Sequence, residues 1–129
     1  MRRIESHKVA GNENNELSIV VVDESGSGGA NHVYEVGFGY YDTYQDAPDY
    51  YDIATVSFQN GPIPGNGING VTHEVLLAIV KDRLECFQAG PFPCEENKLA
   101  LEYVTQALEI LKNRTKDRIK RAVEGQLKA

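Results

Sequence analysis

The stretch NRTKDRIKRAVEG, at residues 113–125, concentrates basic side chains in a chain whose formal net charge is −6. Its first nine residues hold three arginines, two lysines and one aspartate. A guanidinium group binds phosphate through planar, bidentate contacts and tolerates partial burial, whereas an ammonium group stays hydrated. The chemistry that these residue types suggest is therefore the binding of a compact anion.

On a helix with 100° per residue, the arginines of this stretch separate from the lysines. With Leu111 set to zero, an apolar stripe at about 20–80° contains Val104, Leu108, Thr115, Ile119 and Ala122. A flank at about 280–340° contains Arg114, Arg118, Arg121 and Gly125. The opposite flank, at about 100–180°, contains Lys112, Lys116 and Lys120. Arginines beside an apolar stripe suit a row of phosphate contacts, but the ordinary charged flank of an amphipathic helix gives the same pattern, and basic residues are favoured near a helix C-terminus.

Two glycine-rich loops are further candidates for binding phosphate. SGSGGANH (25–32) follows a predicted strand, and its backbone N–H groups could cradle an anion, or it could be an ordinary hairpin loop. It is not a Walker A loop, because no Gly-Lys-Ser/Thr follows. GNGING (65–70) matches G-x-G-x-x-G, but no second strand follows its helix, so a dinucleotide fold is excluded. Its glycines then permit a tight turn, with Asn69 or Thr72 as helix cap, although the helix N-terminus there could still face a phosphate.

The segment CFQAGPFPCEEN (86–97) places aromatic rings and an amide at a proline-rich break between two helices. Phe87 or Phe92 could stack on a purine, and Asn97 could read an adenine edge or a ribose hydroxyl. Alternatively, both rings simply pack the corner. Catalytic patterns are weak: Cys86, Cys94 and His73 lack zinc-ligand spacing, and no G-x-S-x-G motif occurs. We expect a binding protein without a metal or a cofactor, and not an enzyme.

The elements that must position these residues indicate an α+β fold. Strands are predicted at 17–23, 33–41 and 51–59, with an acidic turn at 42–50 and a loop at 60–70. Helices are predicted at 71–88, where Val71, Val75, Leu76, Ile79, Val80 and Leu84 share one stripe, and at 95–125. We expect one domain over 1–129, in which a small antiparallel sheet in the N-terminal half packs against a C-terminal antiparallel helical hairpin. Residues 1–16 are expected to form a flexible or edge segment.

Composition narrows the class of protein. The chain has 129 residues, of which 41% are hydrophobic, and no apolar run is long enough for a membrane span. The basic start lacks the apolar core of a secretory signal, and the two cysteines fit free thiols in a reducing compartment. Residues 1–60 hold 3 Lys/Arg and 10 Asp/Glu, whereas residues 113–129 hold 6 and 2. An acidic chain with a small basic patch suits a compact anion better than a DNA or RNA polymer.

These motifs together resemble a known phage family. The runs SGSGGANHVYE (25–35), FQNGPIPGNGINGVTHEVLLAIVKDRLECFQAGPFPCEEN (58–97) and RTKDRIKRAVEG (114–125) are similar to the first type of Thoeris anti-defence protein. The resemblance implies a sponge in the host bacterial cytoplasm that sequesters glycocyclic ADP-ribose, the signal made by TIR proteins, without cleaving it. It also implies dimers that assemble into hexamers, and a hairpin similar to that of a phage anti-CBASS protein. In some members it implies a second site for CBASS cyclic trinucleotides.

The resemblance also implies roles for particular residues. Phe87 is expected to stack on the adenine, Asn97 to hydrogen-bond the ligand, and Arg114 and Arg118 to hold the pyrophosphate. A further wall would comprise Ser27, Gly28, Gly29, Ala30, Asn31 and His32, and the trinucleotide site would include Arg121 and Gly125. Two alternatives remain open. One is a hydrolase of the same nucleotide with His32 as base, and the other is a structural protein whose basic helix pairs with the acidic segment 41–52 of a neighbouring subunit.

Overall fold

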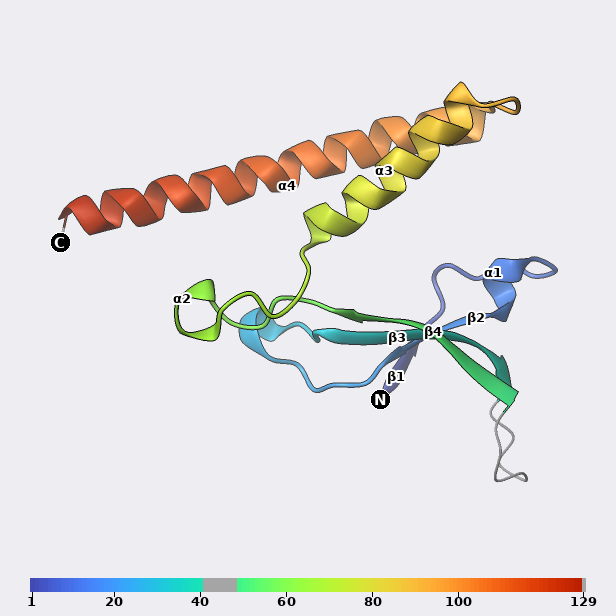
Figure 1. Ribbon diagram of the computed structural model, residues 1–129, viewed down its shortest axis with the longest axis horizontal. Helices are drawn as coiled ribbons and strands as arrows, with labels where there is room; N and C mark the ends of the chain where they lie inside the picture. Colours follow the sequence, from blue (N-terminus) through green and yellow to red (C-terminus); the bar gives the residue numbers. More distant parts are fainter. Residues whose placement is uncertain (41–48, 129) are drawn as a thin grey trace. The chain divides into compact units, whose positions relative to one another are not determined.

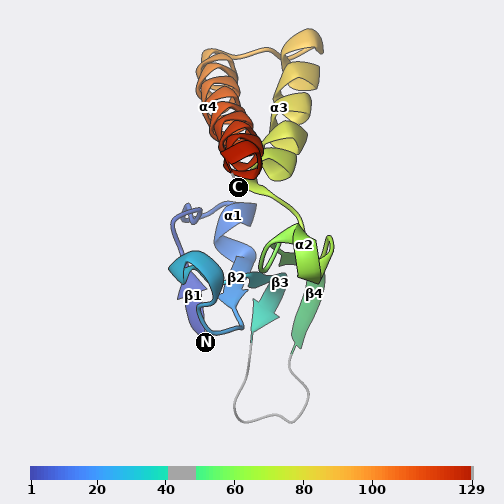
Figure 2. The same ribbon diagram turned by 90° about the vertical axis from the view of Figure 1, so that its left-hand side faces the viewer.

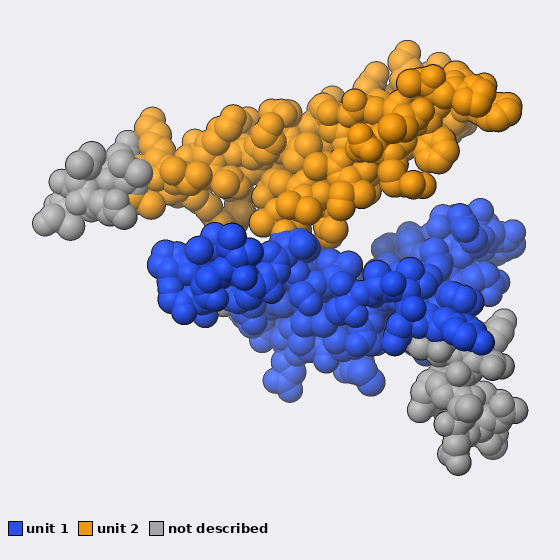
Figure 3. All heavy atoms as spheres, in the orientation of Figure 1, with its two compact units in different colours: residues 1–71 blue, residues 72–129 orange. Residues whose placement is uncertain are grey.

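The computed structural model describes the backbone of residues 1–40 and 49–128. The chain forms two compact units, Met1–Val71 and Thr72–Ala129, which Figure 3 colours separately. The first unit is built on a β-sheet and the second is a pair of helices (Figure 1). The predicted α+β class is confirmed, with strands in the N-terminal half and a helical hairpin in the C-terminal half.

The sheet of the first unit is an antiparallel meander. Its strand order is β1 (Arg2–Ile4), β2 (Leu17–Val21), β3 (Val33–Tyr40) and β4 (Asp49–Ser57). Strand β2 ends two residues before the predicted boundary, because Asp23 turns its carboxylate back onto the backbone of β3. Most of the acidic turn predicted at 42–50 lies outside the described residues.

The first unit buries little of its own apolar surface. Val21, on a central strand, is the fully buried apolar side chain among the described residues. Aromatic pairs add cross-strand packing: the Phe38 and Tyr51 rings stack with centroids 5.1 Å apart, and Tyr34 meets Phe58 edge-on at 5.6 Å. Tyr51 and Ile53 on β4 are nevertheless more than half exposed. The sheet therefore presents apolar surface that its own unit does not cover.

The segment before β2 is tied to the sheet. Strand β1 pairs with β2 as an edge strand, and a one-turn helix, α1 (Glu13–Glu16), begins at the Asn12 side chain, which accepts the Asn14 N–H. The Lys8 ammonium group donates to the Asn15 and Leu17 carbonyls. These contacts tie residues 1–16 to the edge of the sheet.

The loop between the sheet and the hairpin is held by amide side chains. The Asn69 side chain forms two hydrogen bonds with the Asn60 backbone: it accepts the Asn60 N–H and donates to the Asn60 carbonyl. The Gln59 side chain donates to the Gly61 and Gly67 carbonyls across the turn α2 (Ile63–Asn66). The G-x-G-x-x-G match is thus a structural turn. The Thr72 hydroxyl, and not Asn69, caps the following helix by accepting the Val75 N–H.

The second unit is a hairpin of unequal helices. Helix α3 (His73–Ala89) has 17 residues and helix α4 (Glu95–Lys128) has 34, and they lie side by side in Figure 2. The apolar stripe of α4 is partly buried at Val104, Leu108 and Leu111, whereas every residue from Lys112 to Ala122 is exposed. None of the helices in the described ranges combines the length and the apolar composition that a membrane span requires.

The predicted core stripes are therefore only half correct. Thr115, Ile119 and Ala122 are exposed, because α3 is too short to reach the second half of α4 (Figure 1). On α3, Val75, Ile79 and Val80 are about half exposed, because a single partner helix covers only part of a wide apolar face. Sequence periodicity indicates which face is apolar but not how much of it the same chain covers.

Replacing Gly70 with alanine should destabilise the first unit more than a replacement elsewhere in the loop. A Cβ atom at Gly70 would overlap the Phe58 carbonyl group, where the loop forms backbone hydrogen bonds with β4 and its continuation. We expect a loss of about 3 kcal/mol or more in the free energy of unfolding. Urea unfolding followed by circular dichroism at one fixed protein concentration measures it. Gly65→Ala is the control, because its site is open and only its positive φ is strained, at a cost of about 1–2 kcal/mol. Equal losses in both variants would contradict this account.

Candidate functional site

The hairpin corner presents an aromatic ring beside a shallow hollow. Helix α3 ends where the Gly90 N–H bonds to the Phe87 carbonyl. The Gln88 side chain then accepts the N–H of Cys94, the residue just before α4. Phe87 is 53% exposed there. A hollow of about 330 Å³ is lined by Asp82, Arg83, Cys86 and Phe87, all on one side of α3. The ring is therefore accessible to a flat partner.

Asn97 lies at the same end of the hairpin. It is in the first turn of α4, is partly buried, and has no side-chain hydrogen bond to any other described residue. Its amide is thus available to a ligand as both donor and acceptor. Phe92, in the connection between the helices, is 86% exposed and does not pack the corner. The structure brings Phe87 and Asn97 to one end of the hairpin.

The predicted phosphate-binding arginines lie far from that end. Arg114 is 17 residues beyond Asn97 on one continuous helix, which is about 25 Å at 1.5 Å per residue. Arg114, Arg118 and Arg121 are all exposed, and Arg121 bonds through Nε to the Asp117 carbonyl. Gly125 is a residue of α4. One copy of the hairpin therefore carries two separate groups of candidate residues, an aromatic end and an arginine-bearing end.

The glycine-rich loop of the first unit is internally bonded. Ser27–Gly29 form a 3-10 turn in which the Gly29 N–H bonds to the Gly26 carbonyl, and the Gly26 N–H bonds to the Ala30 carbonyl at 2.8 Å. Gly28 and Gly29 have φ angles of 76° and 82°, so the turn requires residues that accept positive φ. Two of the N–H groups expected to cradle an anion are thus already bonded within the loop.

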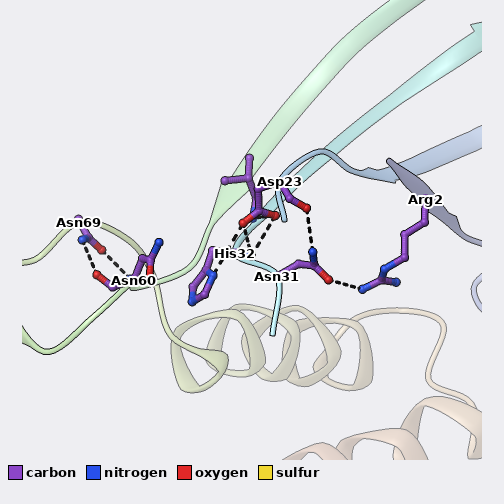
Figure 4. Close-up of polar contacts among 7 residues, drawn as sticks. Arg2, Asp23, Asn31, His32, Asn60 and Asn69 are labelled. Carbon is purple, nitrogen blue, oxygen red and sulfur yellow. Dashed lines mark hydrogen bonds and ion pairs between the residues drawn. The ribbon is translucent and has the colours of Figure 1, made fainter. Parts of the chain in front are cut away.

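Asp23 anchors the end of this loop, a role that sequence reasoning missed. Its carboxylate accepts the backbone N–H groups of His32, at 2.9 Å, and Val33, at 3.0 Å, and Asn31 donates to the Asp23 carbonyl (Figure 4). The pKa of Asp23 is lowered, chiefly by the hydrogen bond from the Val33 N–H. Partial burial raises the pKa, and the hydrogen bond from the His32 N–H lowers it further. An aspartate between a strand and a glycine-rich loop is a signal for such a backbone anchor.

His32 is buried beneath the loop and does not present a free base. It is 6% exposed, its Nδ1 is buried without a hydrogen bond, and that atom lies 3.8 Å from the Asp23 carboxylate. A Cβ atom at Gly26 would come within 3.0 Å of the imidazole ring, so the glycine allows the loop to close over it. Within the described residues, no three His, Cys, Asp or Glu side chains are grouped to hold a metal ion.

Comparison with known proteins places this geometry in a family. The family model described as the Acb2/Tad1 hairpin domain matches residues 52–116, half of the chain. The chain belongs to the Acb2/Tad1 hairpin family. The match runs from β4 into α4 and includes Phe87, Asn97 and Arg114, while Arg118 lies two residues beyond it. Family membership confirms the resemblance that the sequence motifs indicated.

A curated relative supports the same assignment. The protein named Thoeris anti-defense 1 of Bacillus phage SBSphiJ7 is 47% identical to this chain over 73 residues. The alignment covers 57% of this chain and 51% of that protein. The chain therefore aligns with about half the length of this member of the family.

Asp23→Asn should loosen the end of the glycine-rich loop. The amide keeps the side-chain shape but loses the charge that strengthens the bonds from His32 and Val33. Hydrogen-exchange protection factors of these two amides should fall. In the unaltered protein the protection of both amides should be retained at pH values above the ordinary aspartate pKa of 3.8. It should be lost as the pH falls through the pKa of Asp23 in the folded protein, which is lower. Glu24→Gln, at an exposed neighbouring acid, is the control. Unchanged protection in Asp23→Asn would refute the anchor.

Proposed function

We propose that this chain is a phage anti-Thoeris protein that binds glycocyclic ADP-ribose tightly and holds it without cleaving it. The observation that carries the proposal is that one hairpin of the Acb2/Tad1 family holds two groups of candidate ligand residues, one at its corner and one along the exposed half of α4. The relative's name, Thoeris anti-defense 1, supports the biological setting. A protein acting on this signal would work in the cytoplasm of the host bacterium.

The chemistry of the candidate residues complements the ligand. A cyclic ADP-ribose isomer carries a purine, two riboses and two phosphate charges. The exposed Phe87 ring offers a stacking face, the Asn97 amide can bond a hydroxyl or a base edge, and two guanidinium groups match the pyrophosphate. Each chemical part of the ligand thus has a counterpart of the required type on the hairpin.

Binding without turnover is favoured over hydrolysis. His32, the candidate base of the hydrolase alternative, is buried under the glycine-rich loop and its Nδ1 lies beside the Asp23 carboxylate. A general base must reach the proton that it removes, within about 3 Å or through one water. The proposal therefore gives the loop Ser27–His32 a role in binding and none in catalysis.

The separation along α4 favours a site made by two copies. Asn97, at the aromatic end, and Arg114 are about 25 Å apart along α4, farther than one compact nucleotide spans. Suppose that two α4 helices pair antiparallel about a two-fold axis that passes between positions 106 and 107. A residue of one copy is then at the same height along the helix axis as the residue of the other copy whose number brings the sum to 213. Along the helix axis, Asn97 of one copy is then level with the turn from Arg114 to Arg118 of the other.

The surface of α4 suits this pairing. Leu99, Tyr103 and Ile110 are exposed by 49%, 68% and 67%, and with Gln106 they follow the 4-3-4 spacing of a helix-pairing seam. The antiparallel arrangement sets Tyr103 against Ile110 of the second copy. It also sets the acidic first turn of one α4, with Glu95 and Glu96, beside the basic end of the other. We therefore propose a homodimer as the smallest binding unit, with hexamers as a further assembly.

The resemblance extends the proposal to a second ligand. Arg121 and Gly125 would contribute to a separate site for cyclic trinucleotides of the CBASS system. Both lie on α4 beyond the turn that bears Arg114 and Arg118, on the same predicted flank. The structural-protein alternative depends on the acidic segment 41–52, of which residues 41–48 lie outside the described part of the chain.

The test of sequestration is recovery of intact ligand. The protein is incubated with a molar excess of glycocyclic ADP-ribose, the free nucleotide is separated and kept for analysis, and the protein is heat-denatured. We expect unmodified ligand to be released in proportion to protein, as measured by liquid chromatography and mass spectrometry. A cleaved nucleotide in excess of protein would establish the hydrolase instead, and no retained ligand would refute both.

Variants that complement one another test the two-copy site. Truncating Arg114 or Arg118 to alanine should each cost about 2–5 kcal/mol of binding free energy, because a phosphate charge is left unpaired. Lys116→Ala is the matched control, since it removes the same charge from the other flank.

Co-expression of two defective chains tests whether the site is shared between copies. One chain carries Phe87→Ala and Asn97→Ala, and the other carries both arginine changes. The mixture should regain about a quarter of the wild-type binding capacity, because half of the dimers contain both chains and each of these has one intact site out of two. No regained capacity by calorimetry would contradict a shared site.

A further inference from the structure

A cation lies over the ring of Phe87. The guanidinium carbon of Arg83, one turn earlier on α3, lies 5.5 Å from the centroid of the Phe87 ring. This is the range in which a cation is attracted to the negative face of an aromatic ring. Because the Phe87 residue is 53% exposed, the arrangement leaves apolar surface available for a second flat group.

We propose that Arg83 is a positioning residue that holds the Phe87 ring in the orientation in which a purine base stacks on it. This inference rests on the proposed function, because it takes the base of the bound nucleotide as the second flat group. An exposed phenylalanine near a helix end exchanges between rotamers, and fixing one of them on binding costs conformational entropy. A guanidinium group against one face reduces that cost before the ligand arrives.

The neighbouring side chains favour this role over direct contact with phosphate. Asp82 lines the same hollow, and its carboxylate is 4.0 Å from the Cys86 sulfur. A phosphate placed in the hollow would be repelled by that carboxylate at close range. Arginine also suits a stacked position better than lysine, because its guanidinium is planar and weakly hydrated. The hollow therefore carries one positive and one negative side chain, and so offers a phosphate no net positive charge.

A double-mutant cycle separates the two roles. The affinity for glycocyclic ADP-ribose is measured for the unaltered protein, Arg83→Met, Phe87→Ala and the double variant. Arg83→Met should weaken binding about two- to fivefold in the unaltered protein and have no further effect in Phe87→Ala. The affinity of Arg83→Lys should fall between those of the unaltered protein and Arg83→Met. Lys81→Met is the matched control, since Lys81 pairs with Glu85, also on α3. The same loss in both backgrounds would show that Arg83 contacts the ligand directly and would overturn the inference.

A measurement without ligand tests the contact itself. The chain has no tryptophan, so Phe87→Trp introduces a single indole fluorophore at the ring position. Its fluorescence anisotropy should decay faster when Arg83→Met is added, with helix content by circular dichroism unchanged. An unchanged decay would overturn the positioning role. Failure of the unaltered protein to bind nucleotide would instead overturn the proposed function, so the two failures are distinguishable.

Discussion

The length difference between the two helices of the hairpin is the constraint on which the candidate site depends. Helix α3 is half as long as α4, so it buries the apolar stripe of α4 only as far as Leu111. Beyond that point the arginines stand on an exposed helix that the hairpin itself does not cover. A hairpin with equal arms would bury this face, and it would leave less room for a ligand or a second copy beside Arg114 and Arg118.

Very few of the described side chains are fully buried. Val21 and His32 are the buried side chains among the described residues, while α3 and α4 expose valine, isoleucine, leucine and tyrosine. A small core leaves a domain only marginally stable, and assembly commonly supplies the missing burial. In the proposed dimer, the surfaces that stabilise the protein and the surfaces that bind the nucleotide are adjacent, so assembly and ligand binding would support each other.

Several residues that could take part in chemistry are engaged in holding the backbone. The Asp23 carboxylate secures the end of the glycine-rich loop, and the Asn69 amide bonds the neighbouring strand–helix turn. His32 is sealed by the same loop, where Gly26 allows the close approach. Because buried polar groups need partners, motifs of aspartate, asparagine and glycine arise from turn geometry as readily as from ligand binding. The residues left exposed on the hairpin are consequently the better candidates for function.

The sequence by itself determined the three strands from residue 17 onward, the hairpin, its proline-rich corner and the residue types at each end. These features follow from local preferences: β-branched runs, helical periodicity, and proline and glycine at breaks. Only the tertiary structure decided how far α3 reaches along α4, that Thr72 and not Asn69 caps α3, and that Asp23 holds the loop. Periodicity identifies the apolar face of Ile119 but not whether anything covers it. Coverage depends on helix lengths and on the path of the chain, and residues far apart in sequence meet only when the whole chain has folded.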